Sequence, residues 1–411
     1  MTAAPPSRYA ISFVFITVLL DMVGFGLIMP VLPALIQDVG HLDIAHAALI
    51  GGWLFAAFSI TQFLFGPTMG NLSDAYGRRP LLLLAVAGLF VDYLIMALAP
   101  NLTWLFVGRL FAGFCGASYV VANAYIADVT APEDRAKAFG MMGAAFGLGF
   151  VIGPAIGGLL GTFGPRVPFY VAAGVSLLNF LFGYFVLPET LPPDKRRNFV
   201  WGRANPIGTF KIFGTYKGVL PLCAVMAIYF FATSVYPAIW PYWATAKFGW
   251  SAAMIGLTLA AFGIVSALFQ GGATGWAVKN FGEWNVALFG MVIGVIAVFG
   301  YGLATGLSMV LVLLVVHGPE GFVHPMLTAM ISKEVPADAQ GEMQGGMASI
   351  QSLAMLIGTL FFSQMFGFFL LPTSPIVSPD IAFFAAGGFI ILALVIFLLK
   401  AQKPQRSKEL T

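Results

Sequence analysis

Three ionisable side chains lie close together in a long apolar stretch near residue 320, where an isolated charge is costly. His317, Glu320 and His324 are spaced i, i+3 and i+7, so on a regular α-helix they share one face. Histidine and glutamate chains within membrane spans are typical of proton relays. Two other interpretations are a polar patch satisfied by carbonyls that nearby prolines free, or a metal site with three ligands. The spacing is not specific for a metal, so we predict a proton relay and no metal site.

Two aspartates and one arginine also lie within apolar stretches. Asp21, Asp92 and Arg109 must each face a cavity or an opposite charge, because an isolated charge in hydrocarbon is expensive. A carboxyl group in such surroundings is suited to carrying a proton. We predict that Asp21 binds protons and that Arg109, close to it, keeps it ionised until the substrate or a helix movement separates them. Alternatively, Arg109 is a structural charge at the outer membrane edge, and Asp92 lies outside the central cavity.

Polar and aromatic side chains at helical spacing indicate an amphipathic pocket. Arg109 and Asn123 share a face with small residues, and a stripe of tyrosine and tryptophan runs from residue 229 to residue 243. Such a stripe is more often packing than recognition, but rings with polar tips suit a wet cavity for flat, partly polar ligands. The candidate substrate-binding residues are Gln62, Asn123, Tyr229, Tyr236, Trp240, Trp243, Ser266, Gln270 and Gln351.

A short polar run, Gly70–Pro80, separates two apolar stretches and is expected to be a cytoplasmic turn. Gly77 should have a positive φ, and Asp74 should cap a neighbouring helix. The two arginines after Gly77 hold the loop on the positive side of the membrane. The alternative is an ordinary basic turn that only fixes topology. The predicted conformational latch consists of Gly70, Asp74, Gly77, Arg78, Arg79 and Asp128.

Another apolar stretch carries small residues at four-residue spacing. This spacing builds a tight packing face, and a proline within it removes a backbone hydrogen bond and bends the helix. Simple helix packing is the alternative to a functional motif. The residues concerned are Gly149, Gly153, Pro154, Gly157 and Gly158.

The composition decides the class of protein that must position these residues. Of 411 residues, 59% are hydrophobic and 9% are charged, with a mean hydropathy of +0.92. A soluble globular chain has about 25% charged residues. The chain is therefore expected to be an all-α polytopic membrane protein. Its net charge of +3 is confined to loops and gives no reason to expect a nucleic-acid partner. Cys115 and Cys223 lie in apolar runs and imply no disulfide framework.

About 20 apolar residues span the hydrocarbon core, so we predict twelve transmembrane helices. They cover residues 9–36, 47–70, 80–99, 103–128, 136–162, 166–188, 217–246, 251–278, 283–304, 307–331, 341–371 and 379–400. We predict two pseudo-symmetric six-helix bundles, residues 1–190 and 217–411, joined by a cytoplasmic linker, residues 191–216.

The two predicted halves resemble each other in sequence. Gly275–Gly282 follows the eighth span as Gly70–Gly77 follows the second, but it has lost the aspartate and the two arginines. Such duplication is typical of transporters that bind substrate at the midplane between the halves. If both termini lie in the cytoplasm, the only basic residues in the outer loops are Arg166 and Lys247. Because cytoplasmic loops are enriched in Lys and Arg, we predict cytoplasmic termini in a bacterial inner membrane.

Together these motifs resemble the tetracycline-efflux branch of the drug–proton antiporters in the major facilitator superfamily. The likeness covers nearly the whole chain and is densest in residues 19–165. It rests on Leu-Leu-Asp21 with Gly-Leu-Ile-Met-Pro-Val-Leu-Pro, Asp74 with Gly77-Arg-Arg-Pro, Gly108-Arg109 with Ile126-Ala-Asp128, Phe146-Gly-Leu-Gly with Gly-Pro and Gly-Gly, and Phe248-Gly-Trp.

The resemblance implies roles for several of these residues. Gln62 and Gln270 would contact the antibiotic, and Asp21, Asp92 and Arg109 would belong to the proton-coupling set. The predicted latch would stabilise the outward-facing state. The glycine run at 149–158 would be the antiporter motif, which is found in exporters and is usually missing from importers.

The chain departs from the resembled family at two positions. Ser266 stands where the family usually has a histidine in the eighth span, and Gly294 stands where it has an acid in the ninth. These departures leave tetracycline specificity and the identity of the proton site open. Glu320 with its two histidines could couple transport to protons instead.

We predict a proton-coupled secondary transporter, not an enzyme, that exports an amphipathic small molecule by alternating access. The proton gradient drives it, so no cofactor is expected, although a tetracycline-like substrate would arrive as a metal chelate. Its partners would be the substrate, protons and the lipid bilayer, and it would function as a monomer. The alternatives are a proton-coupled importer of a nutrient or metabolite on the same fold, and a membrane receptor that has lost transport.

Overall fold

The computed structural model describes residues 8–116, 118–131, 134–200, 210, 212–336 and 339–400. The regular secondary structure in these ranges is helical, without strands. The chain divides into two compact units, Met1–Pro206 with Trp240–Gly263, and Ile207–Ile239 with Ile264–Thr411. The two six-helix bundles, 1–190 and 217–411, and the linker 191–216 remain a prediction.

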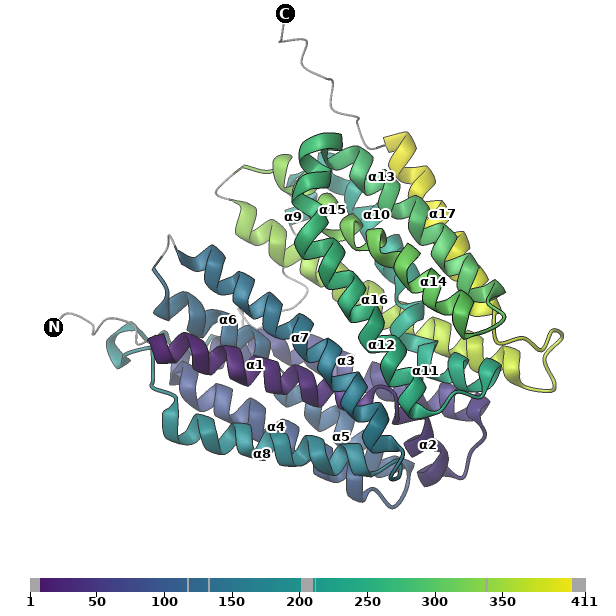
Figure 1. Ribbon diagram of the computed structural model, residues 1–411. Coiled ribbons are helices and arrows are strands. Elements are labelled where there is room, and N and C mark those ends of the chain that lie inside the picture. The colour runs from purple at the N-terminus through teal and green to yellow at the C-terminus, as the bar shows by residue number, and fades with distance from the viewer. Residues whose placement is uncertain are drawn as a thin grey trace, which may run out of the picture. The chain divides into compact units, whose positions relative to one another are not determined.

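In the first unit, long helices pack side by side in pairs. Those before the linker are α1 (Arg8–Ile28), α2 (Leu32–Gly40), α3 (Ile44–Tyr76), α4 (Arg78–Leu98), α5 (Leu102–Cys115), α6 (Ser118–Val129), α7 (Arg135–Gly161) and α8 (Val167–Val186). Helix α1 packs along α7, α4 along α8, and α3 along α5 (Figure 1). The short helix η2 (Pro193–Lys195) follows, and the unit also takes in the end of α11 (Val235–Phe248) and most of α12 (Ala252–Ala267).

The second unit contains the remaining helices. They are α9 (Ile212–Thr215), η5 (Lys217–Val219), α10 (Leu220–Thr233), the π-helix η6 (Leu268–Ala273), α13 (Thr274–Leu303), α14 (Leu307–His317), the 3₁₀-helix η7 (Gly318–Phe322), α15 (Val323–Lys333), α16 (Gln340–Leu370) and α17 (Ile381–Lys400). Helix α10 packs against α16 and α17, and α13 packs against α15 and α17.

The predicted twelve spans are consistent with these helices. The described residues contain nine helices long and apolar enough to cross a membrane, or ten when the pair α1 and α2, bent by 53°, counts as one. One of these runs, Ala252–Leu303, has 52 residues. At the helical rise it is about 78 Å long, more than twice the roughly 30 Å of the hydrocarbon core. It breaks at Gly282, which has φ 76°, and α5 with α6 supplies the remaining interrupted span.

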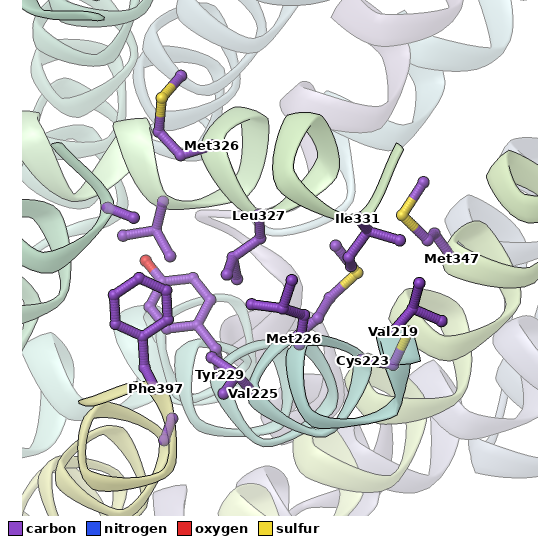
Figure 2. Close-up of a cluster of buried hydrophobic side chains, with 14 of the residues drawn as sticks. Val219, Cys223, Val225, Met226, Tyr229, Met326, Leu327, Ile331, Met347 and Phe397 are labelled. Carbon is purple, nitrogen blue, oxygen red and sulfur yellow. The ribbon is translucent and has the colours of Figure 1, made fainter. Parts of the chain in front are cut away.

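The core of the second unit is a cluster of apolar side chains between α10, α15, α16 and α17. Figure 2 shows Met226 and Tyr229 of α10 facing Leu327 and Ile331 of α15, with Phe397 of α17 beside them. These side chains are buried, and Tyr229 is the one drawn with a polar tip. A buried hydroxyl requires a hydrogen-bond partner, so the Tyr229 hydroxyl must bind a polar group next to the apolar core.

The outer faces of the helices are apolar as well. Leu178 and Phe185 of α8 and Leu268 of η6 are among the large apolar side chains that are exposed. Soluble proteins rarely expose apolar side chains along whole helices. A surface of this kind is what a lipid bilayer covers, so the chain is a multi-pass membrane protein.

Capping residues outside the spans fix where two of the helices begin. Asp43 precedes α3 and accepts a hydrogen bond of 2.9 Å from the backbone N–H of His46. This bond, together with the contact to the His46 ring, lowers the pKa of Asp43. Asn101 caps α5 in the same way through the N–H of Trp104.

Candidate functional site

A buried histidine–glutamate pair lies inside the second unit. His317 Nε2 is 2.7 Å from Glu320 Oε2, and the two residues are 5% and 4% exposed. The hydroxyl of Tyr229 donates to Glu320 Oε1 over 3.0 Å, and that of Tyr236 donates to Oε2 over 3.3 Å. On the other side of the imidazole, the Tyr301 hydroxyl is 3.2 Å from His317 Nδ1. Three tyrosines from α10, α11 and α13 thus surround one ionisable pair.

The 3₁₀-helix η7 brings the pair together. Pro319 opens η7, and a 3₁₀-helix has 3.0 residues per turn, so side chains three apart stand directly above one another. Helix α13 leaves room for them, because a Cβ on Gly294 would stand 3.0 Å from Glu320 Cδ. The position where the resembled family has an acid is therefore a glycine that packs against the Glu320 carboxyl group.

His324 does not share the face of the pair, and the prediction that one face carries all three side chains is wrong. It assumed an unbroken α-helix, whereas η7 changes the number of residues per turn between His317 and His324. His324 is exposed and packs edge-on against Phe230 with ring centroids 5.2 Å apart. Among the described residues, no three side chains of His, Cys, Asp or Glu gather in a way that could hold a metal ion.

The first unit holds a second buried ion pair, between Arg109 of α5 and Asp92 of α4. Arg109 Nη2 donates to Asp92 Oδ2, with Asp92 fully buried and Arg109 7% exposed. Phe58 lies under the guanidinium at 5.7 Å from the ring centroid, and Gly108 leaves space for the Asp92 carboxylate. Arg109 is thus a buried, paired charge rather than one that reaches the outer membrane edge.

Asp21 of α1 is also buried, at 4% exposure, and accepts a hydrogen bond of 3.2 Å from Asn179 Nδ2 of α8. The same amide donates to the carbonyl of Thr17. The ion pair described for Arg109 is with Asp92, so an action of Arg109 on Asp21 stays a prediction. Sequence reasoning missed Asn179, although a lone amide in an apolar span was a detectable signal.

The two glutamines predicted to contact antibiotic lie at interruptions of neighbouring helices. Gln62 Nε2 donates to the carbonyl of Gly116 over 3.0 Å, where span four breaks between α5 and α6. In the second unit, Gln270 packs against Gly321 within η7. Each unit therefore has a glutamine against a glycine in its interrupted helix. Their contact with substrate remains a prediction.

Two of the other predicted binding residues, Trp240 and Trp243, pack against each other in the first unit. Trp240 Nε1 donates to Thr258 Oγ1 over 3.2 Å, and Trp243 is fully buried against Trp240 and Phe248. This arrangement matches the packing interpretation of the aromatic stripe, while Tyr229 and Tyr236 bind Glu320. The half-buried candidates are Asn123, Ser266 and Gln351.

Several of the predicted latch residues meet at the end of α3. Gly77 has φ 111°, and Arg78 binds Asp74 Oδ1 over 2.6 Å and Asp128 Oδ2 over 2.9 Å. The expected cap of a neighbouring helix by Asp74 stays a prediction. The Asp74 carboxylate binds the Arg78 side chain and, in the described contacts, does not cap the start of α4. Glu189 does so instead, accepting from the backbone N–H of Arg78 over 2.9 Å. Sequence reasoning missed Glu189, which follows the sixth span directly and carries the negative charge that a helix N-terminus favours.

The loop Gly275–Gly282, which repeats Gly70–Gly77 in the second half of the sequence, also has a glycine with positive φ. The ion pair next to it has the opposite polarity. Gly282 has φ 76°, as Gly77 has a positive φ. The next residue, Glu283, binds Lys333 Nζ at the end of α15 over 2.7 Å. Arg78 binds Asp128 near the end of α6 in the corresponding way.

The glycine run of α7 forms a packing face against α1. A Cβ on Gly153 would stand 2.7 Å from the Val23 carbonyl oxygen and 2.8 Å from Gly26 Cα. Gly149 and Gly157 meet the α1 backbone equally closely, one turn to either side. On another side of α7, Gly158 and Pro154 meet Gly256 of α12.

Comparisons with known proteins agree with this architecture. The chain matches the Major Facilitator Superfamily over residues 14–359 and 222–411. It belongs to this superfamily. Membership places the chain among membrane transporters rather than enzymes.

Several relatives of this facilitator are resistance proteins. It is 40% identical over 363 residues to the class C tetracycline resistance protein of Escherichia coli, covering 88% of this chain and 90% of that protein. It is 38% identical to the class G protein of Vibrio anguillarum over 84% and 88% of the two chains. Among solved structures, the nucleoside transporter NupG superposes with a TM-score of 0.77 at 13% identity, covering 97% of this chain and all of that one. The human organic anion transporter MFSD10 gives 0.71 at 22%, covering 96% and 100%. These structures show the fold alone.

Proposed function

We propose that this facilitator exports a tetracycline-like amphipathic small molecule in exchange for protons. The observation that carries the proposal is the occurrence of buried, hydrogen-bonded ionisable groups inside each unit, Asp92–Arg109 in one and His317–Glu320 in the other. Buried charges of this kind are costly in a membrane and mark ion pathways. The similarity to tetracycline resistance proteins supports the substrate class and the direction of transport.

Four of the predicted residues have a stated role in the proposal. Asp21 and Glu320 belong to the proton-binding sites, and Arg109 changes partner as the transporter changes state. The latch around Arg78 stabilises one of the alternating states. One proton moving inward supplies about 2.3 kcal/mol per 100 mV of membrane potential, besides the pH difference.

The setting follows from the same proposal. The protein lies in a bacterial inner membrane with both termini in the cytoplasm and works as a monomer without a cofactor. A tetracycline would be carried as its chelate with a divalent cation, which makes the metal part of the cargo. The basic residues of the predicted cytoplasmic loops support this orientation.

Transport in everted membrane vesicles tests the proposal. Vesicles with an acidic interior, supplied with tetracycline and Mg²⁺, should accumulate the drug, and collapse of the pH gradient should release it. Drug addition should also alkalinise the vesicle interior, because antiport moves protons out of it. Control vesicles carry the Arg78→Gln variant, which breaks the latch.

The same assay separates the proposal from its rivals. A proton-coupled importer would drive substrate out of acidic everted vesicles together with protons. A receptor without transport would neither accumulate drug nor change the internal pH. Either result would contradict the proposal.

A further inference from the structure

We infer that the proton taken up in the second unit resides on His317, at Nδ1, and that Glu320 stays a carboxylate. The inference rests on the proposed function, since it names the proton-binding atom of the proton-coupled exporter. Two arrangements of a protonated pair compete: an imidazolium beside a carboxylate, or a neutral imidazole beside a carboxylic acid. The geometry around each side chain decides between them.

Glu320 is surrounded by hydrogen-bond donors. The Tyr229 hydroxyl donates to Oε1, and the Tyr236 hydroxyl and His317 Nε2 both approach Oε2, at 3.3 and 2.7 Å. Hydrogen bonds to the charged form favour that form. Protonating Oε2 would require Nε2 to become an acceptor and would weaken the bond from Tyr236. The carboxylate is therefore the form that this cage of donors fits.

His317 can accept a proton with little rearrangement. Since a carboxylate oxygen only accepts, Nε2 carries a hydrogen and Nδ1 of the neutral ring accepts from the Tyr301 hydroxyl, 3.2 Å away. When Nδ1 gains a proton, that hydroxyl needs only to rotate so that its oxygen accepts. A hydroxyl is both donor and acceptor, so both protonation states of the ring keep a partner.

In the contacts of the residues that the structure describes, the titratable side chains that form hydrogen bonds with the pair are tyrosines. They are Tyr229 of α10, Tyr236 of α11 and Tyr301 of α13. Tyrosine ionises only near pH 10 even when unperturbed. The net charge of the site therefore changes from −1 to 0 when one proton binds, without any covalent step.

This charge change links protonation to movement. A single negative charge in a water-excluded site is far less favourable than a neutral ion pair. The protonated pair thus suits a state in which the site is closed, and the deprotonated pair suits a state in which water reaches it. Gly294 lets the Glu320 carboxyl group lie against the α13 backbone, where a Cβ would stand 3.0 Å from Glu320 Cδ.

Magnetic resonance of the full-length protein in lipid tests the inference directly. The chain has only four histidines, so ¹⁵N-histidine labelling gives few signals, and His317→Gln identifies the one of interest. Labelling of glutamate carboxyl carbons, assigned with Glu320→Gln, reports the carboxyl group. Over a range of pH values, the form of the site that has bound the proton should show two N–H groups on the His317 ring, while the Glu320 signal is that of a carboxylate.

A second variant makes the inference sharper. The double substitution Tyr229→Phe with Tyr236→Phe removes two donors from Glu320, so the proton should then move to the carboxyl group. A protonated Glu320 beside a neutral ring in the wild-type protein would overturn the inference. So would a His317 ring that stays neutral across the range.

These readouts do not depend on transport. Failure of drug accumulation in everted vesicles would refute the proposed export, whereas failure of the histidine signal to change would refute only this assignment. In the transport assay His317→Gln should lower proton-driven accumulation at least tenfold. The exposed His46, which lies at the start of α3, provides the matched control His46→Gln with unchanged accumulation.

Discussion

At the scale of single residues, three buried carboxyl groups inside the predicted membrane spans have defined partners. Asp92 binds Arg109, Glu320 binds His317 and two tyrosines, and Asp21 binds an amide. Removing one partner of a buried pair leaves an uncompensated charge, whereas removing both charges removes the penalty as well. Single and double substitutions at a buried ion pair can therefore separate its effect on stability from its effect on transport.

Replacing Asp92 alone should separate these two effects. Asp92→Asn leaves the Arg109 guanidinium buried without its counter-ion, so we expect a loss of about 3–5 kcal/mol in stability. The double variant Asp92→Asn with Arg109→Gln should regain much of that stability but not drug transport. Thermal unfolding in detergent, followed by transport assays of both variants, provides the measurement.

Comparing the single variant with the double variant shows whether the charges of Asp92 and Arg109 serve transport, folding or both. If the double variant transported the drug at the wild-type rate, Asp92 and Arg109 would be only structural. If the single variant were as stable as the wild type, the ion pair would contribute nothing to folding.

At the scale of helices, small residues decide which elements can touch. The α7 glycines lie directly on the α1 backbone around Gly26, and any side chain there would displace one helix. Van der Waals contact is the main force between helices in lipid, so such glycine faces determine neighbours. The two glycines with positive φ, Gly77 and Gly282, similarly determine where the chain turns between spans.

The substitution Gly153→Ala should damage the α1–α7 contact. A Cβ there meets the Val23 carbonyl oxygen at 2.7 Å, and such overpacking costs typically about 1–3 kcal/mol. The matched control is Gly147→Ala in the same helix, where a Cβ meets nothing within 4 Å. It should be neutral or stabilising by about 0.5–1 kcal/mol, because glycine is a poor helix former. Equal melting temperatures for the two variants would contradict this account.

The two turn-associated ion pairs should differ in strength. Arg78 is largely buried and binds Ser73, Asp74 and Asp128. The Lys333 side chain is 68% exposed, and its partner among the described residues is Glu283. Exposed pairs contribute about 0–1 kcal/mol, so Lys333→Gln should change stability little. Arg78→Gln should approach the cost of about 3 kcal/mol for a broken buried pair. Unfolding of both variants at low and high salt tests the difference.

The reversed polarity of the second pair can be tested by exchange. Glu283→Lys combined with Lys333→Glu should restore what either single change removes, since the pair has no further partners in the described contacts. Exchange of Arg78 with Asp128 should fail, because Asp74 would then face a like charge. Rescue by both exchanges would show that neighbours of Arg78 do not matter.

At the scale of the whole molecule, the ionisable groups should couple substrate movement to protons without being needed for movement itself. Asp21→Asn and Glu320→Gln should reduce uphill accumulation at least tenfold, which corresponds to about 1.4 kcal/mol. Exchange of labelled for unlabelled drug at equal pH on both sides should persist, because it needs no net proton transfer. Counterflow in proteoliposomes measures that exchange, and full uphill transport by both variants would contradict the proposed coupling.

The sequence alone determined what lies in the membrane and which residues are unusual there. Apolar runs of about 20 residues define the spans, and charges within them stand out because hydrocarbon penalises each one. The positive φ of Gly77 and the glycine face of α7 could also be predicted from the sequence, because turns and four-residue spacing are local properties. Family membership followed from the same motifs.

Only the tertiary structure decided which partners these residues have. Arg109 binds Asp92, Glu189 caps α4, and His324 lies apart from His317, because helix packing and the 3₁₀ turn at η7 set these relations. A sequence read with a constant 3.6-residue period cannot detect a change of period, nor which of several helices will be neighbours. Contacts between distant spans depend on how glycine faces fit together, and that fit is a property of the folded bundle.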